Sequence, residues 1–364
     1  MLTEPFYQSD VCYFADNGAS LVILDQTLLP IEERYVHLHT AEEIADAIRK
    51  LRVRGAPLIG VAAAMGICVA LKNAGSIASF ESICSTIEQA RPTAINLPWA
   101  VRHMRETRQK LCFDDFEFAT SMLRGAAQKL LQHQKEADGY IGMYGAILLD
   151  ELNVSRSHNR VSSFHSQEEE VLGILTHCNA GHLATGGIGT ATAPIYTAMV
   201  KNIPIRVYVD ETRPLLQGAR LTAYELSRSG VPATLLCDNM AASLMAQGKI
   251  DIIFVGADRI ARNGDTANKI GTSNVAILAK HFGIPFYVCA PQSTFDAQCA
   301  EGKDILIEQR GAEEVRSLWY RHLMAPMDVQ VYNPSFDVTP HNLITAFVTE
   351  KGIMKPQEIA TIFS

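Results

Sequence analysis

A cysteine between two histidines stands out first, in residues 174–193 (ILTHCNAGHLATGGIGTATA). Cys178 lies between His177 and His182, and a glycine-rich turn follows. Residues of these types can ligate a metal, attack a substrate, exchange a proton or hold a phosphate through backbone amides. The rest of the chain must distinguish these possibilities.

A zinc site is the first interpretation, and the spacing argues against it. Structural zinc takes two spaced pairs of ligands, and catalytic zinc takes three ligands from different elements. His177 and Cys178 are adjacent at the end of an expected strand, where alternation would send their side chains to opposite faces. We therefore expect no metal site.

A dinucleotide site is the second interpretation. Asp210 ends an apolar run about 20 residues after the glycines, as a ribose-binding acid would. The fingerprint, however, needs G-x-G-x-x-G directly after a strand, whereas Gly187 and Gly189 come about ten residues after His177, and Thr192 takes the third glycine position. We expect no nicotinamide cofactor, although the turn could still present amides to a phosphate at the start of a helix over 189–201.

Two readings of Cys178 remain open from the residues alone. His182 could act as the base for a nucleophilic thiol. Alternatively, Cys178 is a small buried residue, as we expect for other cysteines of the chain: Cys12, Cys68, Cys84 and Cys289. A position at the tip of a strand favours a functional role.

The second half of the chain alternates between short apolar runs and helical segments. Continuous apolar strands separated by helices predict a parallel sheet covered on both faces. Such a sheet binds ligands beyond the carboxyl ends of its strands. The predicted strands are VLGILTH (171–177), PIRVYVD (204–210), PATLLC (232–237), IDIIFVG (250–256) and IPFYVCA (284–290).

Polar residues follow each of these runs, so we expect them to meet in one crevice. They include Cys178 after the first run, Asp210 and Gln217 after the second, Asp238 after the third and Asp258 after the fourth. We expect Asp210 and Asp238 to cap or orient other groups rather than to catalyse.

The first half of the chain has a different sequence pattern. Helical periodicity dominates residues 41–150, and SLVILDQTLLP and ERYVHLHT ahead of it predict a small antiparallel sheet. Residues 151–170 are polar, lack periodicity and predict a connector. The expected fold is α/β: a mostly helical N-terminal domain (1–150) with a small sheet, a connector (151–170) and a Rossmann-like domain (171–364).

Composition is that of an ordinary soluble globular protein, with 48% apolar and 20% charged residues. The net charge of −7 gives no reason to expect nucleic acid or an acidic membrane surface as a partner. We expect no membrane-spanning segment and no secretory signal. The eight cysteines contain no C-x-x-C pair and are expected to be reduced thiols in a cytoplasmic protein.

Several motifs lie along nearly the whole chain: RGAPLIG (54–60), RPTAINLPWA (91–100), LTHCNAGHLATGGIGTA (175–191), DETRPLLQGARLTAYEL (210–226) and VGADRIARNGDTANKIGT (255–272). With these motifs the chain resembles the methylthioribose-1-phosphate isomerase family, which shares its fold with regulatory subunits of a translation-initiation guanine-nucleotide exchange factor. HCNAG together with GADRIARNGDTANKIGT is specific to the catalytic branch.

The resemblance implies an isomerase that converts 5-methylthioribose 1-phosphate to 5-methylthioribulose 1-phosphate, works as a homodimer and uses no metal or redox cofactor. By motif, Asp258 of GADRI would be the acid, and Cys178 of HCNAG its catalytic partner. The implied substrate contacts are Arg54, Gly55, Ala56, Arg91, Gln217, Asn268 and Lys269.

Elementary chemistry supports these roles. The anomeric phosphate prevents ordinary ring opening, so an acid must protonate the ring oxygen. Asp258 follows an apolar strand, where desolvation would raise its pKa. Cys178 would then remove the C2 proton as a thiolate or stabilise a direct hydride shift, and the sequence leaves both routes open.

Two alternatives accompany this function. A related sugar 1-phosphate, such as 5-deoxyribose 1-phosphate or ribose 1,5-bisphosphate, could be the substrate. The chain could also be a non-catalytic binding subunit with the same fold, although the pairing of Cys178 with Asp258 favours an enzyme.

Overall fold

The computed structural model describes residues 5–91, 95–111, 115–159 and 171–362. The chain divides into two compact units. Unit 1 contains Met1–Gly139 and Gly181–Gly189, and unit 2 contains Tyr140–Ala180 and Thr190–Ser364. The HCNAG motif therefore ends where the chain passes from unit 2 back to unit 1.

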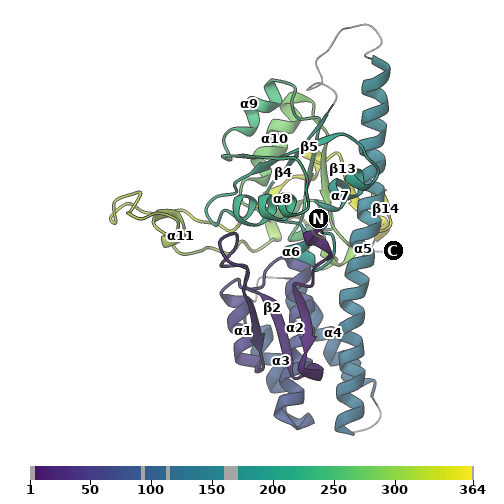
Figure 1. The fold of residues 1–364 in the computed structure, drawn as a ribbon, viewed down its shortest axis with the longest axis vertical. Coiled ribbons are helices and arrows are strands. Elements are labelled where there is room, and N and C mark those ends of the chain that lie inside the picture. Colours follow the sequence, from purple (N-terminus) through teal and green to yellow (C-terminus); the bar gives the residue numbers. More distant parts are fainter. Residues whose placement is uncertain (1–4, 92–94, 112–114, 160–170, 363–364) are drawn as a thin grey trace. The chain divides into compact units, whose positions relative to one another are not determined.

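Unit 1 combines the expected small antiparallel sheet with a group of helices (Figure 1). The sheet has the order β1-β2-β3, in which β1 was not predicted. Its strands are β1 (Cys12–Ala15), β2 (Ser20–Leu24) and β3 (Tyr35–Leu38). Its helices are α1 (Ala41–Arg49), α2 (Ala56–Ala74), α3 (Phe80–Glu88), α4 (Asn96–Gln109), the first part of α5 (Phe116–Asn159) and α6 (His182–Thr185).

Helix α2 forms the centre of unit 1. It packs against α1, α3 and α4 as well as β2, and nearly all its residues from Leu58 to Leu71 are buried. By length and composition alone this 19-residue helix could cross a membrane, but 78% of its most apolar window is buried within the protein. A buried core helix of a globular protein has the same length and composition.

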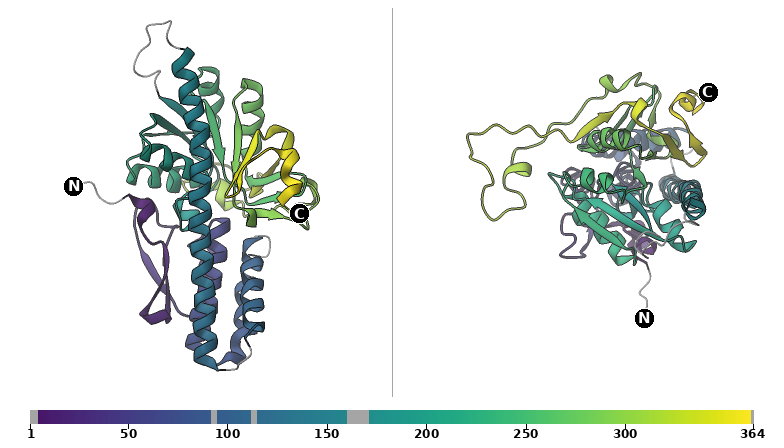
Figure 2. Two further views of the ribbon diagram at one scale, coloured as in Figure 1. Left: turned by 90° about the vertical axis from the view of Figure 1, so that its right-hand side faces the viewer. Right: turned by 90° about the horizontal axis from the view of Figure 1, so that it is seen from above.

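Helix α5 is longer than the sequence indicated. It continues without interruption to Asn159 (Figure 2), so residues 151–159 are helical and not part of a loop. Arg156 holds this end of the helix within unit 2: its guanidinium lies 2.7 Å from Asp251 and donates to the Val171 carbonyl at 3.1 Å. Residues 160–170 of the expected connector lie outside the described residues.

Unit 2 is built on a seven-stranded sheet with the order β14-β13-β10-β7-β4-β5-β6, parallel except for β14. All five predicted strands are present, which confirms the Rossmann-like α/β class. The last two strands were not predicted. The strands are β4 (Leu172–Thr176), β5 (Ile205–Asp210), β6 (Ala233–Leu236), β7 (Ile252–Val255), β10 (Phe286–Cys289), β13 (Ala346–Thr349) and β14 (Gly352–Met354).

Helices cover this sheet: α7 packs on β5, α8 on β6 and α10 on β10. A π-helical turn, η5, leads directly into α8. The helical elements of unit 2 after β4 are α7 (Ala193–Val200), η5 (Gly218–Thr222), α8 (Ala223–Arg228), α9 (Ala241–Ala246), α10 (Thr272–Phe282) and α11 (Glu313–Arg316).

A second, smaller sheet follows β7 in the chain, with the order β11-β8-β9-β12. Its strands are β8 (Arg259–Ala261), β9 (Thr266–Lys269), β11 (Phe295–Asp296) and β12 (Phe336–Thr339). This sheet was not predicted, and it carries the ANKIG motif on β9. Short 3₁₀ turns complete the chain: η1 (Phe6–Gln8), η2 (Asp16–Gly18), η3 (Ile77–Ser79), η6 (Gln292–Thr294), η7 (Gly302–Asp304), η8 (His341–Leu343) and η9 (Pro356–Ile362).

Candidate active site

Cys178 lies just beyond the carboxyl end of β4 in a left-handed backbone conformation, with φ of 65°. Strand β4 ends at Thr176, so the alternation rule does not reach Cys178. Two threonine hydroxyls hold its backbone: the amide donates to Thr212 Oγ1 at 2.8 Å, and the carbonyl accepts from Thr222 Oγ1 at 2.6 Å. The cysteine is thus placed by a defined local structure rather than by its strand.

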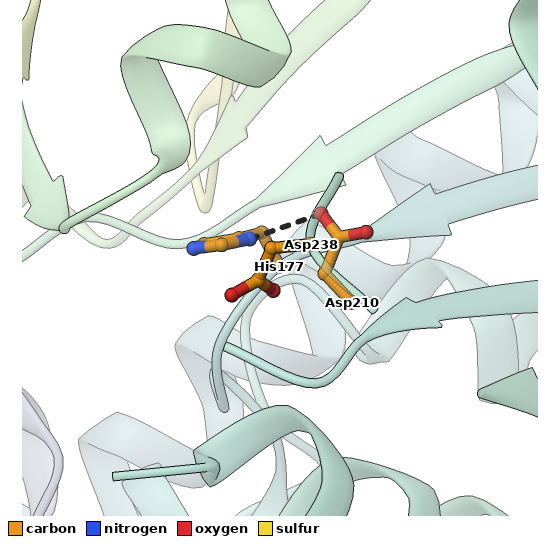
Figure 3. A group of neighbouring side chains, drawn as sticks. All are labelled: His177, Asp210 and Asp238. Carbon is orange, nitrogen blue, oxygen red and sulfur yellow. Dashed lines mark hydrogen bonds and ion pairs between the residues drawn. The ribbon is translucent and has the colours of Figure 1, made fainter. Parts of the chain in front are cut away.

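His177, the preceding residue, is buried and has a partner at each ring nitrogen. Nδ1 lies 3.0 Å from Asp210 Oδ2 (Figure 3). Nε2 lies 2.9 Å from the Ile270 carbonyl oxygen. Burial alone would lower the pKa of His177, but the hydrogen bond and charge of Asp210 raise it. For Asp210, burial acts in the opposite direction and raises the pKa. Both directions describe a pair that retains its shared proton.

By distance, His177, Asp210 and Asp238 could surround a cation, because one ligand atom of each lies within 4.8 Å of the others. Most of these atoms already take part in hydrogen bonds; the exception within the described residues is Asp210 Oδ1, which has no hydrogen-bond partner. The two carboxylate oxygens of Asp238 accept from the amides of Thr212 and Arg213, each at 2.7 Å. The chemistry of this group is therefore that of a hydrogen-bonded cluster, as expected for aspartates that orient other groups.

Asp258 lies in the bend between β7 and β8, where its amide donates to the Ala267 carbonyl at 2.9 Å. Strands β7 and β4 are neighbours in the parallel sheet. The segments that follow them are tightly packed, since a Cβ added at Gly256 would lie 2.6 Å from the Ala180 Cβ. Both glycine and alanine are two residues from a predicted catalytic residue, so the fold brings the Asp258 and Cys178 segments together.

Asn268 and Lys269 lie at the end of β9 in the same unit. The Asn268 amide group donates to Thr272 Oγ1 at 3.0 Å, and Lys269 Nζ lies 4.9 Å from the centroid of the Phe336 ring. Lys269 is only 7% exposed, an unusual degree of burial for a lysine. His177 joins this segment to Cys178, because its ring bonds to the carbonyl of Ile270.

Gln217 follows β5 and immediately precedes the π-helical turn η5, a kind of structure frequent at functional sites. Its side chain is 5% exposed, and Oε1 has no hydrogen-bond partner within the described residues. A buried amide oxygen without a partner is costly unless something binds there. This atom is thus suited to accept a hydrogen bond from a ligand.

The remaining predicted contacts lie in unit 1. Gly55 precedes α2 with φ of +93°, and a Cβ there would lie 2.4 Å from the Ala184 Cα, so only glycine fits. Ala56 is the first residue of α2, and Arg54 comes directly before the glycine. Arg91 lies between α3 and α4, next to residues outside the described ranges.

The glycine-rich turn is not the phosphate cradle that we expected at Gly187 and Gly189. The amides of both glycines donate to Thr185 Oγ1, at 3.0 and 3.2 Å, and Gly189 also donates to Asp138 at 3.1 Å. Helix α7 begins only at Ala193, beyond the turn. Burial raises the pKa of Asp138 to about 8, although hydrogen bonds from Thr185, Gln134 and Gly189 oppose this shift.

His182 also has an internal role in unit 1. Its Nδ1 bonds to the Gly187 carbonyl, and its Nε2 lies 3.3 Å from Ser9 Oγ. Burial lowers its pKa to about 4, so the ring is neutral near pH 7. The other cysteines behave as expected, since Cys12, Cys68, Cys84 and Cys289 are buried.

Sequence reasoning assigned no role to the two threonines that hold Cys178, although Thr212 is among the polar residues that follow the second predicted strand. Thr212 lies in the DETRP motif, next to residues that we singled out, but no spacing rule connects it to a cysteine 34 positions away. Thr222 was hidden in a segment read as an ordinary helix.

Comparison with known proteins finds relatives that match nearly the whole chain. The chain is 51% identical over 348 residues to a methylthioribose-1-phosphate isomerase of Symbiobacterium thermophilum, covering 94% of this chain and 91% of that one. It is 46% identical over 342 residues to a 5-deoxyribose 1-phosphate isomerase of Bacillus cereus, covering 92% and 93%.

The crystal structure of 5-methylthioribose 1-phosphate isomerase from Pyrococcus horikoshii OT3 matches the fold with a TM-score of 0.85 and 36% identity, covering 99% of this chain and 98% of that one. The family model described as the initiation factor 2 subunit family matches residues 52–356. The chain therefore belongs to the initiation factor 2 subunit family.

Proposed function

We propose that the chain is an enzyme that isomerises 5-methylthioribose 1-phosphate to 5-methylthioribulose 1-phosphate, a step of methionine salvage. The observation that carries this proposal is the placement of Cys178 and Asp258 after neighbouring parallel strands, in segments packed together at Ala180 and Gly256. Isomerases at 46–51% identity over more than nine-tenths of the chain support it.

The first chemical step needs an acid. Asp258 protonates the ring oxygen, and the C1–O bond of the ring breaks while the phosphate stays on C1. Hydrogen then moves from C2 to C1, and the C2 hydroxyl returns its proton to the Asp258 carboxylate as the C2 carbonyl forms. Cys178 either removes the C2 proton as a base or stabilises a direct hydride shift.

Isomerisation in D₂O distinguishes these routes, because only a base in exchange with solvent delivers deuterium to C1.

The polar contacts divide between phosphate and sugar. Arg54, Arg91 and Lys269 are cations suited to phosphate oxygens, and the buried Lys269 supplies a point charge with little screening by water. Gln217 Oε1 accepts from a sugar hydroxyl, which would satisfy an atom that has no hydrogen-bond partner among the described residues. Asn268, Gly55 and Ala56 complete the proposed substrate contacts.

A related substrate is the first alternative. One of the similar proteins is named a 5-deoxyribose 1-phosphate isomerase, and the two sugar phosphates differ only in the group on C5. The decisive assay compares turnover of 5-methylthioribose 1-phosphate, 5-deoxyribose 1-phosphate and ribose 1,5-bisphosphate by the purified protein. We expect the highest kcat/KM with the first. A higher kcat/KM with one of the other two sugar phosphates would make that compound the assigned substrate. No turnover of any of the three would favour a non-catalytic binding subunit.

We also propose that the protein is a homodimer. The segment 305–332, which contains α11 and extends from the sheets of unit 2 (Figure 1), carries many exposed apolar side chains that suit an interface. They are Leu306, Leu318, Tyr320, Leu323, Met324, Met327, Val329 and Tyr332. Light scattering coupled to gel filtration measures the mass directly. A cytoplasmic location is a further proposal, supported by buried thiols such as Cys68 and Cys289.

A further inference from the structure

The backbone of Cys178 is in a conformation that it would not adopt unaided. Its φ of 65° lies in the left-handed region, which costs an L-residue other than glycine about 1–2 kcal/mol. Cysteine has no short amide or carboxylate side chain to stabilise that region locally. Surrounding groups must therefore hold it.

Thr212 provides the first of these groups. Its hydroxyl accepts from the Cys178 amide at 2.8 Å and donates to the Asp210 carbonyl at 2.9 Å. A hydroxyl has a single hydrogen, so its use toward Asp210 fixes a lone pair in the direction of Cys178. The interaction thus has a defined orientation.

Thr212 is itself held in the left-handed region, with φ of 64°, although it is β-branched. Its amide donates to Asp238 Oδ1 at 2.7 Å, and the amide of Arg213 donates to Oδ2 of the same carboxylate at 2.7 Å. Gly218 packs against this turn: a Cβ there would lie 1.7 Å from the Asp210 carbonyl oxygen. Strain at Thr212 is therefore maintained by fixed neighbours on both sides.

The carbonyl of Cys178 has a matching partner. Thr222 Oγ1, from the π-helical turn η5, donates to it at 2.6 Å and accepts from Asn179 Nδ2 at 3.1 Å. Both polar groups of the Cys178 backbone are consequently bound by hydroxyls from one segment of unit 2, residues 212–222.

We propose that Thr212 is a positioning residue for catalysis: its hydroxyl, oriented by the Asp210 carbonyl, holds Cys178 in the left-handed conformation that presents the thiol to the substrate. This inference rests on the proposed function, because it assigns Thr212 a part in placing the catalytic cysteine. Thr212 acts through Cys178 and needs no contact with the substrate.

The test compares Thr212→Val, which keeps the shape and removes the hydroxyl, with Thr212→Ser, which keeps the hydroxyl. We expect Thr212→Val to lower kcat about ten- to hundred-fold, the size of one lost buried hydrogen bond, with KM changed less than three-fold. Thr212→Ser should retain kcat within about three-fold. Should Thr212→Val not fold, Thr212→Ala makes the same comparison with less strain.

Thr349→Val is a matched control. The Thr349 hydroxyl also accepts from an amide (Lys351, 3.1 Å) and donates to a carbonyl (Gly352, 3.1 Å), and its residue is fully buried in β13. The Thr349→Val variant should have a lower melting temperature, but its kcat should fall by no more than about three-fold. A kcat loss in Thr349→Val equal to that in Thr212→Val, or a wild-type kcat in Thr212→Val, would overturn the proposal.

Alkylation of Cys178 by iodoacetamide, quantified by peptide mass spectrometry as a function of pH, gives a readout independent of turnover. We expect a changed rate or pH profile at Cys178 in Thr212→Val and an unchanged one in Thr212→Ser. If the wild-type protein isomerised no sugar phosphate, the proposed function would fail, but this readout would still decide whether Thr212 positions the thiol. An identical Cys178 profile in all variants would refute it.

Discussion

Substitution of Gly55 by alanine tests whether the start of α2 must approach Ala184 as closely as the structure shows. The new Cβ would lie 2.4 Å from the Ala184 Cα and 2.5 Å from its carbonyl oxygen, both backbone atoms that cannot rotate away. It would also occupy φ of +93°, a conformation nearly exclusive to glycine. The strained backbone costs about 1–3 kcal/mol and the overlap about 1–3 kcal/mol more.

Gly75→Ala is the matched control, because it ends the same helix. Gly75 has φ of +64°, but a Cβ there would meet no atom within 4 Å. This control therefore has the backbone cost alone, about 1–2 kcal/mol. We expect Gly55→Ala to reduce the free energy of unfolding by about 1–4 kcal/mol more than Gly75→Ala does.

Urea unfolding followed by Trp99 fluorescence reports on unit 1, since Trp99 lies in α4, which packs on α2. The chain has two tryptophans, so a Trp319→Phe background isolates this signal. Equal unfolding midpoints for the two glycine variants would show that the close approach of Gly55 to Ala184 is not needed, and would refute the reasoning.

Two further predictions concern buried polar groups. Burial raises the pKa of Asp138 to about 8 in the folded protein, far above its value in the unfolded chain. The protonated carboxyl therefore makes its full contribution to the free energy of unfolding below about pH 4, and this contribution is lost as the pH rises to 8. Asp138→Asn should accordingly gain stability relative to wild type over this range, by about 1.4 kcal/mol per pH unit; parallel curves of melting temperature against pH would contradict this. Gln217→Leu should raise KM about ten-fold without lowering the melting temperature, because it removes a buried oxygen that has no partner within the described residues; a lower melting temperature with unchanged KM would mark Gln217 as structural.

The sheet of unit 2 could be predicted because its strands are continuous apolar runs that end in polar residues. Strand β13 (Ala346–Thr349) and the second sheet were missed, since their strands have only two to four residues and little β-specific pattern. Helix α5 extends past the predicted boundary because Arg156 ties a polar, exposed segment to Asp251, a contact that no local periodicity reveals.

The site residues could be named by motif, but their backbone geometry could not. Nothing in the type of Cys178 indicates a left-handed conformation, because that state depends on hydroxyls of Thr212 and Thr222, which are far away in the chain. The prediction of a phosphate site at the glycine-rich turn was wrong for the same reason. The Gly189 amide already donates to Asp138 of α5, about 50 residues earlier in the chain, and to Thr185, and neither contact can be read from the glycine pattern.

The most direct test of the central claim measures binding and turnover of 5-methylthioribose 1-phosphate by Cys178→Ser and Asp258→Asn. Calorimetry gives the dissociation constant, and NMR of the sugar gives the rate. We expect both variants to bind the substrate within about ten-fold of wild type and to show no measurable isomerisation, because each lacks a group that exchanges a proton or stabilises the transition state. Near-normal turnover by either purified variant would contradict the assignment of Cys178 and Asp258 as the catalytic pair.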